Sequence, residues 1–258
     1  MSAYYNEFDP YAAQWLRNLI AAGHLPAGDV DDRSITEVSP DDLRPYTQAH
    51  FFAGIGGWPL ALRLAGWPDD KPVWTGSCPC QPLSSAGQRK GHADERHLWP
   101  AFHNLISECG PPVVFGEQVA SADGREWFSA VRADLEAVGY ACGAADLCAA
   151  GVGAPHIRQR LWWVADASGF GWNGWKRPKT GDKYLKIERP KRLCSTDHLW
   201  KRSEWLSCSD GKTRPSQPGT FPLAHGISGR VGRLRAYGNA IVPQVAAQFV
   251  TAFMGCNP

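Results

Sequence analysis

The sequence predicts an α/β fold built around an open, largely parallel sheet, with a smaller irregular region attached. Short aromatic or β-branched runs lead into glycine-rich or polar loops and then into helices, as where Ala49–Phe52 precedes the turn 53–57 and a helix over Trp58–Ala65. Strands that alternate with helices in this way are typical of parallel sheets. At 258 residues the chain can hold one large core and a small appendage.

The other elements are predicted from the same hydrophobic patterns. One strand, Val73–Ser77, ends at a cysteine-containing loop, and another, Pro112–Phe115, ends beside Glu117. A carboxylate at the carboxyl end of a parallel strand lies where open α/β sheets bind ligands. We also expect helices over Pro10–Ala22, Leu98–Glu108 and Asp123–Val138, strands over Ala141–Cys148 and Leu161–Ala165, and a last helix that Tyr237–Pro243 opens and that runs through Phe253.

Composition argues against several classes of protein. No apolar run reaches membrane-spanning length, and the first residues lack the basic and hydrophobic regions of a signal peptide, so we expect a cytoplasmic protein. The eight cysteines are scattered, without a C-x-x-C pair. We therefore expect reduced thiols and no metal site.

Charge is unevenly distributed along the chain. Residues 167–222 contain 12 Lys/Arg against 5 Asp/Glu, a net +7, whereas the rest contains 15 against 20, a net −5. Tryptophans at 172, 175, 200 and 205 are interleaved with the basic residues. This combination favours a polyanionic partner bound through one segment, although composition alone fits an ordinary solvated loop equally well.

The loop over residues 76–91, G-S-C-P-C-Q-P-L-S-S-A-G-Q-R-K-G, presents a candidate nucleophile. Cys80 stands between Pro79 and Gln81, directly after the strand, and small and polar residues follow it. Most free cysteines are buried and structural. A glycine-rich stretch carrying Arg89 and Lys90 is hard to explain as core, so the pattern favours a reactive thiol on a loop.

Several motifs occur in an order that resembles the DNA (cytosine-5) methyltransferase family. The similar segments are P-C-Q at 79–81 with the following S-x-x-G-x-x-K-G, F-A-G-x-G-G at 52–57, E-Q-V at 117–119, H-x-R-x-R at 156–160 and G-N at 238–239. Gln118 and His156 depart from the family's asparagine and glutamine but keep hydrogen-bonding capacity. The ordered set is specific, whereas each motif alone is weak.

One departure concerns the order of the motifs. The stretch between Gly57 and Pro79 is too short for the family's ribose-binding and adenine-binding motifs. Similar motifs occur at the N-terminus, as N-E-F-D-P-Y-A from Asn6 and G-D-V from Gly28. We therefore predict a rearranged Rossmann-like methyltransferase sheet, in which strand 2, a helix and strand 3 precede strand 1 and the sheet is preserved.

The resemblance implies a catalytic domain over 1–166, completed by 231–258, and a DNA-binding target-recognition region over 167–230. Its implied catalytic residues are Cys80, Glu117, Arg158 and Arg160. The cofactor S-adenosylmethionine (SAM) would be bound by Glu7, Asp29, Phe52, Ala53, Gly54, Gly56, Gly57, Pro79, Leu98, Asn239 and Ala240. DNA would be contacted by Gln81, Ser84, Arg89, Lys90, Lys212 and Arg214.

The implied activity is methyl transfer from SAM to C5 of a flipped-out cytosine in double-stranded DNA, through a covalent bond between Cys80 and C6, with S-adenosylhomocysteine as product. Such a compact chain resembles phage or restriction-modification enzymes, and we expect a monomer in a bacterial or phage-infected cell. Two alternatives remain, a catalytically silent DNA-binding relative and an RNA cytosine-5 methyltransferase.

Overall fold

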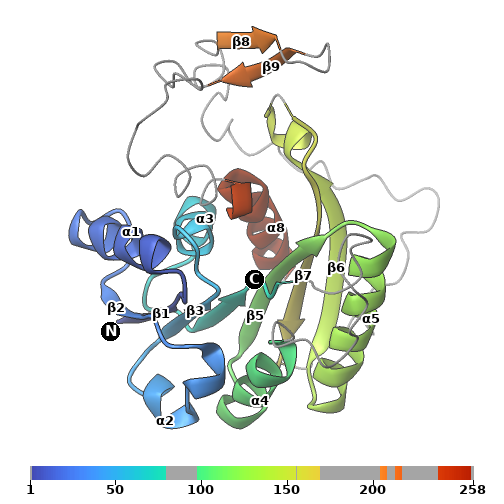
Figure 1. Ribbon diagram of the computed structural model, residues 1–258. Helices are drawn as coiled ribbons and strands as arrows, with labels where there is room; N and C mark the ends of the chain where they lie inside the picture. Colours follow the sequence, from blue (N-terminus) through green and yellow to red (C-terminus); the bar gives the residue numbers. More distant parts are fainter. Residues whose placement is uncertain are drawn as a thin grey trace, which may run out of the picture.

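The computed structural model describes residues 2–79, 98–154, 156–168, 204–207, 213–216 and 238–256. Its centre is a seven-stranded sheet in the order β2-β1-β3-β4-β5-β7-β6 (Figure 1). Strands β2 to β5 in this order are parallel, and β7 runs antiparallel to both of its neighbours. The strands are β1 (Ala3–Asn6), β2 (Gly28–Asp31), β3 (Gln48–Phe51), β4 (Val73–Gly76), β5 (Val113–Val119), β6 (Ala141–Cys148) and β7 (Gln159–Asp166).

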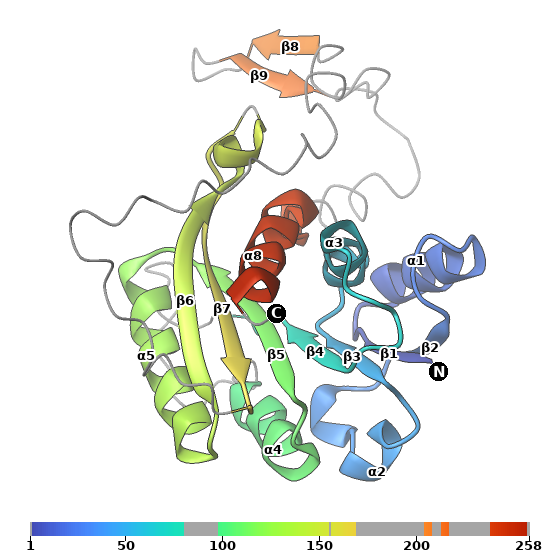
Figure 2. The same cartoon turned by 180° about the vertical axis from the view of Figure 1, so that it is seen from behind.

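Helices cover both faces of this sheet, as the two opposite views show (Figures 1 and 2). Helices α2 (Pro40–Leu43), α4 (Trp99–Cys109) and α5 (Ala122–Ala137) pack on one face. Helices α1 (Pro10–Ala21), α3 (Gly57–Ala65) and α8 (Pro243–Cys256) pack on the other. Short 3-10 turns, η1 (Ile35–Glu37) and η3 (Ala149–Val152), and a separate hairpin of β8 (Glu204–Ser207) and β9 (Thr213–Ser216) complete the described elements.

The strand order confirms the predicted rearrangement. The first strand of the chain, β1, lies between β2 and β3, so the N-terminal β-α-β unit extends the sheet beyond the strand that carries the glycine turn. Asp9 starts α1 by accepting hydrogen bonds from the backbone N–H groups of Tyr11 and Ala12, both at 3.0 Å, and Pro10 supplies a preset helical φ. A chain in this order therefore builds the expected Rossmann-like sheet.

Most predicted elements agree with the structure to within a few residues, but several features differ, among them the hairpin β8–β9 and the turn η3, which were not predicted. The predicted strand at Pro112–Phe115 continues to Val119, and the last regular helix begins at Pro243. The short turns over 35–43 were not predicted, because they carry too few residues for a periodic pattern. Across the part of the chain that the structure describes, no helix is long and apolar enough to span a membrane.

A glycine allows close packing beside the end of β5. A Cβ on Gly116 would come within 2.1 Å of the Trp163 indole, which is fully buried on the neighbouring strand β7. Only a residue without a side chain leaves room for this ring. Gly116 directly precedes Glu117, so the packing also determines where that carboxylate leaves the sheet.

A buried histidine in an inner strand of the sheet makes stability sensitive to acid. His50 is fully buried on β3, its Nδ1 lies 2.9 Å from the Thr75 hydroxyl, and burial lowers its pKa to about 3. The unfolded chain binds a proton near pH 6.5 that the folded protein excludes, so stability should fall as pH decreases through this window.

We expect about 3 kcal/mol of this loss between pH 7 and pH 4. Urea denaturation at both pH values measures it, and His50→Gln should remove most of the difference. The exposed His24 provides the matched control, His24→Gln, which should retain the wild-type acid sensitivity. Equal pH slopes for wild type and His50→Gln would show that His50 is not the cause.

Candidate functional site

The candidate site lies at the carboxyl ends of the parallel strands, where open α/β sheets bind ligands. Glu7 follows β1, the glycine turn 52–56 follows β3, and residues 77–79 follow β4. Glu117 lies near the end of β5. The rearranged chain therefore brings four strand ends together at one edge of the sheet.

Glu7 joins the end of β1 to the glycine turn. Its Oε2 accepts a hydrogen bond from the backbone N–H of Gly54 at 2.6 Å, and its Oε1 accepts one from the N–H of Asp9 at 2.9 Å. The backbone N–H of Ala53 donates to the carbonyl of Asn6 at 3.1 Å. Two hydrogen bonds thus connect strand ends that are more than forty residues apart in sequence.

The turn itself needs left-handed backbone conformations. Gly54 and Gly56 have φ values of 56° and 81°, which glycine adopts without steric cost. Phe52 also has a positive φ, 52°, and its ring packs edge-on against Phe102 of α4, with centroids 6.0 Å apart. A Cβ on Gly54 would meet no atom within 4 Å, so this part of the turn faces open space.

These groups fit the chemistry of SAM. A turn followed by a helix N-terminus suits the anionic methionine end, and a carboxylate suits ribose hydroxyls. Phe8, which follows Glu7, is 71% exposed and offers an aromatic face beside the carboxylate. Phe8 had no role in the sequence analysis, although its place within N-E-F-D was a usable signal.

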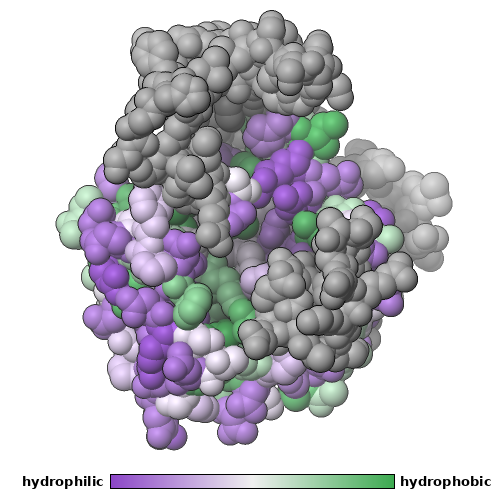
Figure 3. Space-filling view, in the orientation of Figure 1, coloured by the Kyte–Doolittle hydropathy of each residue, from purple (hydrophilic) through white to green (hydrophobic). Residues whose placement is uncertain are grey.

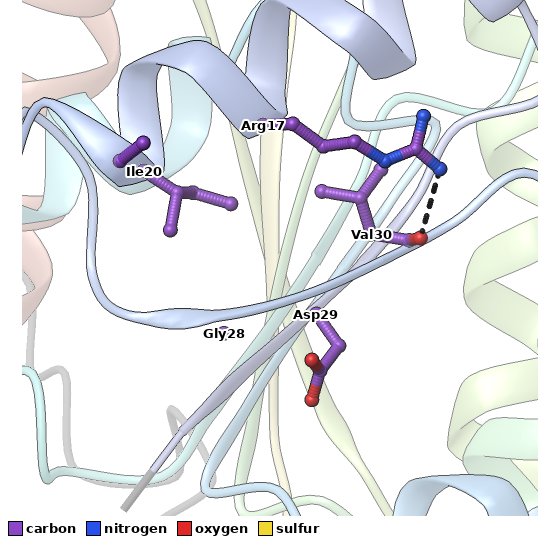
Figure 4. A pocket seen from close by; sticks show the side chains of 6 residues that line it. Arg17, Ile20, Gly28, Asp29 and Val30 are labelled. Carbon is purple, nitrogen blue, oxygen red and sulfur yellow. Dashed lines mark hydrogen bonds between the residues drawn. The ribbon is translucent and has the colours of Figure 1, made fainter.

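Asp29 lies within β2, below the level of Glu7. It pairs with Tyr4, three residues before Glu7, and its carboxylate accepts a hydrogen bond from the Tyr46 hydroxyl at 2.9 Å. Figure 4 shows its side chain directed away from the face of β2 where Arg17 lies. The structure therefore does not bring Asp29 to the level of Glu7, whereas Asp32 follows the end of β2 directly.

Charged side chains surround this edge strand, and Figure 3 shows hydrophilic residues gathered over β2 and α2. Arg33 pairs with Asp31 at 2.6 Å and with Asp42 at 3.3 Å. Arg17 pairs with Asp32 at 3.1 Å and donates to the carbonyl of Val30 at 3.3 Å, a bond drawn in Figure 4. Such charges protect an exposed sheet edge from pairing with another chain.

Glu117 and Arg160 form an ion pair at the carboxyl edge. The two residues come from the antiparallel neighbours β5 and β7, and the Arg160 Nε lies 2.8 Å from the Glu117 Oε1. Burial raises the pKa of the Glu117 carboxyl, and the charges of Arg160 and Arg158 and the hydrogen bond from Arg160 oppose this shift. A largely buried carboxyl of this kind, 12% exposed here, can hold a proton above its ordinary range and donate it.

Two further contacts fix the chain just before Cys80. The Gln118 amide donates to the carbonyl of Cys78 at 3.3 Å, so the residue that departs from the family's asparagine joins β5 to the end of β4. The Trp58 indole donates to the Ser77 hydroxyl at 3.0 Å, a contact that sequence reasoning missed. Cys78 is buried and Pro79 is exposed, which agrees with the alternation of an extended segment.

Arg158 connects the start of β7 to the C-terminal segment. Its Nη2 donates to the carbonyls of Gly238 at 3.1 Å and Ala240 at 2.7 Å. The implied cofactor residues Asn239 and Ala240 are thereby held next to the arginine pair. Leu98, also implied in the cofactor site, precedes α4 and packs against the core on the α2–α4 face.

Several predicted residues lie outside the described part of the chain, and their roles stay predictions. They are Cys80, Gln81, Ser84, Arg89, Lys90 and Lys212. Arg214 lies in β9, where its backbone pairs with Leu206. Within the described ranges no group of three or more His, Cys, Asp or Glu side chains is arranged to hold a metal ion.

Comparison with known proteins gives a family match. The profile described as C-5 cytosine-specific DNA methylase matches residues 67–204. The type II methyltransferase M.AplI of Arthrospira platensis is 32% identical over 115 residues, which make up 44% of this chain and 32% of that protein. The matched part thus spans about a third of the relative's length.

Solved structures with a similar arrangement include three methyltransferases. The S. pombe Dnmt2 methyltransferase has a TM-score of 0.40 at 15% identity and covers 64% of this chain and 51% of its own. A Spodoptera frugiperda DNMT2 mutant has a TM-score of 0.43 at 14% identity, and the match covers 69% of this chain and 54% of that one. A putative DNA modification methyltransferase encoded within an E. coli prophage has a TM-score of 0.39 at 16% identity, and the match covers 64% of this chain and 47% of that one.

The ion pair at the carboxyl edge predicts a measurable pKa change. Arg160→Met removes the largest influence that lowers the pKa of Glu117, so this pKa should rise further. Carbon-13 NMR of labelled glutamate side chains measures the titration. Arg132→Met, which breaks an exposed pair with Glu136 on α5, should leave the Glu117 titration unchanged. An unchanged or lowered Glu117 pKa in Arg160→Met would contradict the assignment.

Proposed function

This chain belongs to the C-5 cytosine-specific DNA methylase family, and on that premise we propose that it methylates C5 of a cytosine in DNA, with SAM as methyl donor. The observation that carries the proposal is the convergence of Glu7, the Gly54 turn and the Glu117–Arg160 pair at one edge of the sheet. A pure DNA-binding relative needs neither a buried carboxyl with a raised pKa nor a carboxylate beside the glycine turn.

SAM would supply an electrophilic methyl group on a sulfonium. Glu7 would accept hydrogen bonds from the ribose hydroxyls, and the turn over Phe52, Ala53, Gly54, Gly56 and Gly57 would hold the methionine end. Pro79, Leu98, Asn239 and Ala240 complete the proposed cofactor contacts, and Asp29 is the implied adenine contact. The arrangement supports a cofactor contact at Glu7 more directly than one at Asp29, because the Asp29 carboxylate accepts a hydrogen bond from the Tyr46 hydroxyl.

Cytosine C5 is a weak nucleophile, so the base needs activation. The Cys80 thiolate would add to C6 while Glu117 donates its proton to N3, which turns the ring into an enamine. Arg160 would donate to the base O2, with Arg158 supporting the pocket. After C5 accepts the methyl group, N3 returns its proton to Glu117. Transfer of the C5 proton to water then re-forms the C5–C6 double bond and breaks the C6–S bond, which expels the Cys80 thiolate.

The target base must leave the duplex for this chemistry. We assign DNA contacts to Gln81, Ser84, Arg89 and Lys90 in the loop after Cys80, and to the basic region 167–230 with Lys212 and Arg214. The net charge of +7 over 167–222 supports that assignment, because phosphate binding is dominated by Lys and Arg. We accordingly divide the chain into a catalytic domain over 1–166, completed by 231–258, and a DNA-binding region over 167–230.

The decisive test of this function is covalent trapping. DNA that contains 5-fluorocytosine cannot lose its C5 substituent, so wild-type protein and SAM should form a DNA adduct that survives denaturing electrophoresis. Cys80→Ala should form no adduct, because the sulfur makes the bond to C6, while the Cys109→Ala control should still form one. An adduct in Cys80→Ala would identify another nucleophile. Labelled SAM supplied with unmethylated DNA or with transfer RNA separates a DNA from an RNA enzyme.

The N-terminal cofactor assignment predicts a loss of affinity. Glu7→Ala should weaken binding of S-adenosylhomocysteine by roughly one to a few kcal/mol, because a hydrogen bond to a charged group is lost. Isothermal calorimetry measures this change, and Glu126→Ala on the exposed surface of α5 is the matched control. Wild-type affinity in Glu7→Ala would remove the N-terminus from the cofactor site.

The same titration decides which aspartate contacts the cofactor. Asp29→Ala should weaken binding by a similar amount if the resemblance carries over to this position. Wild-type affinity in Asp29→Ala together with reduced affinity in Asp32→Ala would move the contact to the end of β2. Both variants remove one carboxylate, from within β2 for Asp29 and directly after it for Asp32, so each serves as a control for the other.

A further inference from the structure

Residues 238–241, called here the linking segment, lie between the two halves of the site. The Ile241 side chain is buried against Gly57, where a Cβ would come within 2.6 Å of its Cγ1. Gly57 starts α3 directly after the glycine turn. Ile241 therefore packs directly on the backbone at the start of α3.

The other end of the linking segment is held by Arg158. One guanidinium nitrogen donates to the carbonyls of Gly238 and Ala240, at 3.1 and 2.7 Å. Arg158 stands two residues before Arg160, whose guanidinium pairs with Glu117 at 2.8 Å. The linking segment thus contacts the cofactor turn on one side and the strand that carries the base-binding arginine on the other.

The backbone at Arg158 is strained. Its φ is +30°, which residues other than glycine rarely adopt, and such conformations persist only where the surroundings compensate for the strain. The preceding residue is fixed, because the carbonyl of Ile157 accepts a hydrogen bond from the N–H of Ala149 at 2.7 Å. The two carbonyls of the linking segment are therefore part of what holds Arg158 in this conformation.

The surroundings of Arg158 also explain why it bonds to carbonyls and not to a carboxylate. Glu117 is already paired with Arg160, and the charge of Arg160 repels a second guanidinium. Among the described residues the buried Nε of Arg158 has no hydrogen-bond partner, so its position depends on the two bonds from Nη2. Arg158 can respond to a shift of the linking segment without breaking the Glu117–Arg160 pair.

We infer that the linking segment couples the cofactor turn to the Glu117–Arg160 pair, with Arg158 as the positioning residue that transmits the coupling. The inference rests on the proposed function, since it concerns the same cofactor and the same base pocket. Ligand binding at the glycine turn restrains Gly57 and Ile241, which restrains the two carbonyls and hence the start of β7. By reciprocity, a base bound at Arg160 raises cofactor affinity by the same factor, about 5-fold or more.

Hydrogen–deuterium exchange of the full chain with S-adenosylhomocysteine tests the coupling. In the wild type the ligand should slow exchange in peptides over 52–60, 157–163 and 238–246. In Arg158→Lys a single ammonium replaces the guanidinium, so protection of 52–60 should remain while that of 157–163 is lost. Arg132→Lys, on the exposed surface of α5, is the matched control and should behave as the wild type.

A second variant acts at the opposite contact. Ile241→Ala removes the atoms that pack on Gly57 and should also abolish ligand-dependent protection of 157–163, which keeps the inference testable if Arg158→Lys does not fold. Protection of 157–163 that persists in these variants, or that is absent in the wild type although 52–60 is protected, overturns the coupling. Failure of the ligand to protect 52–60 in the wild type would instead contradict the proposed cofactor site.

Discussion

The hydrogen bond from the Gly54 backbone to the Glu7 carboxylate connects the two parts of the sheet on which the site depends. Its length is 2.6 Å, and it joins the end of β1 to the turn after β3, although the two residues are 47 positions apart in sequence. A bond to an ionised acceptor contributes more than one between neutral groups. The N-terminal unit therefore supports the glycine turn although it precedes that turn in sequence.

The Glu117–Arg160 pair, which we propose binds the base, is constrained by burial. Taking the Glu117 carboxyl out of water favours its neutral form, whereas Arg160 at 2.8 Å favours the charged form, and the balance leaves the pKa raised. Charge pairs in low dielectric hold their geometry only when both partners are fixed. Packing of Trp163 on Gly116 and the antiparallel register of β5 and β7 provide that fixation.

Local hydrophobic patterns predicted the strands from β3 onward, whereas the resemblance of two N-terminal motifs, one of which contains Glu7, predicted the rearranged order. They did not predict contacts that depend on three-dimensional packing. The Trp58–Ser77 bond and the carbonyls that hold Arg158 join residues 19 to 82 positions apart, and no periodicity reports such pairs. Asp29 illustrates the opposite limit, since a matching motif did not determine which face of an edge strand its side chain occupies.

We propose that an N-terminal β-α-β unit and a later glycine turn form one cofactor site. A crystal structure of the full chain with S-adenosylhomocysteine would test this arrangement. We expect ribose hydroxyls within hydrogen-bond distance of the Glu7 carboxylate and the methionine carboxylate against the turn that contains Gly54. A ligand bound away from β1, with Glu7 contacting only protein atoms, would contradict it.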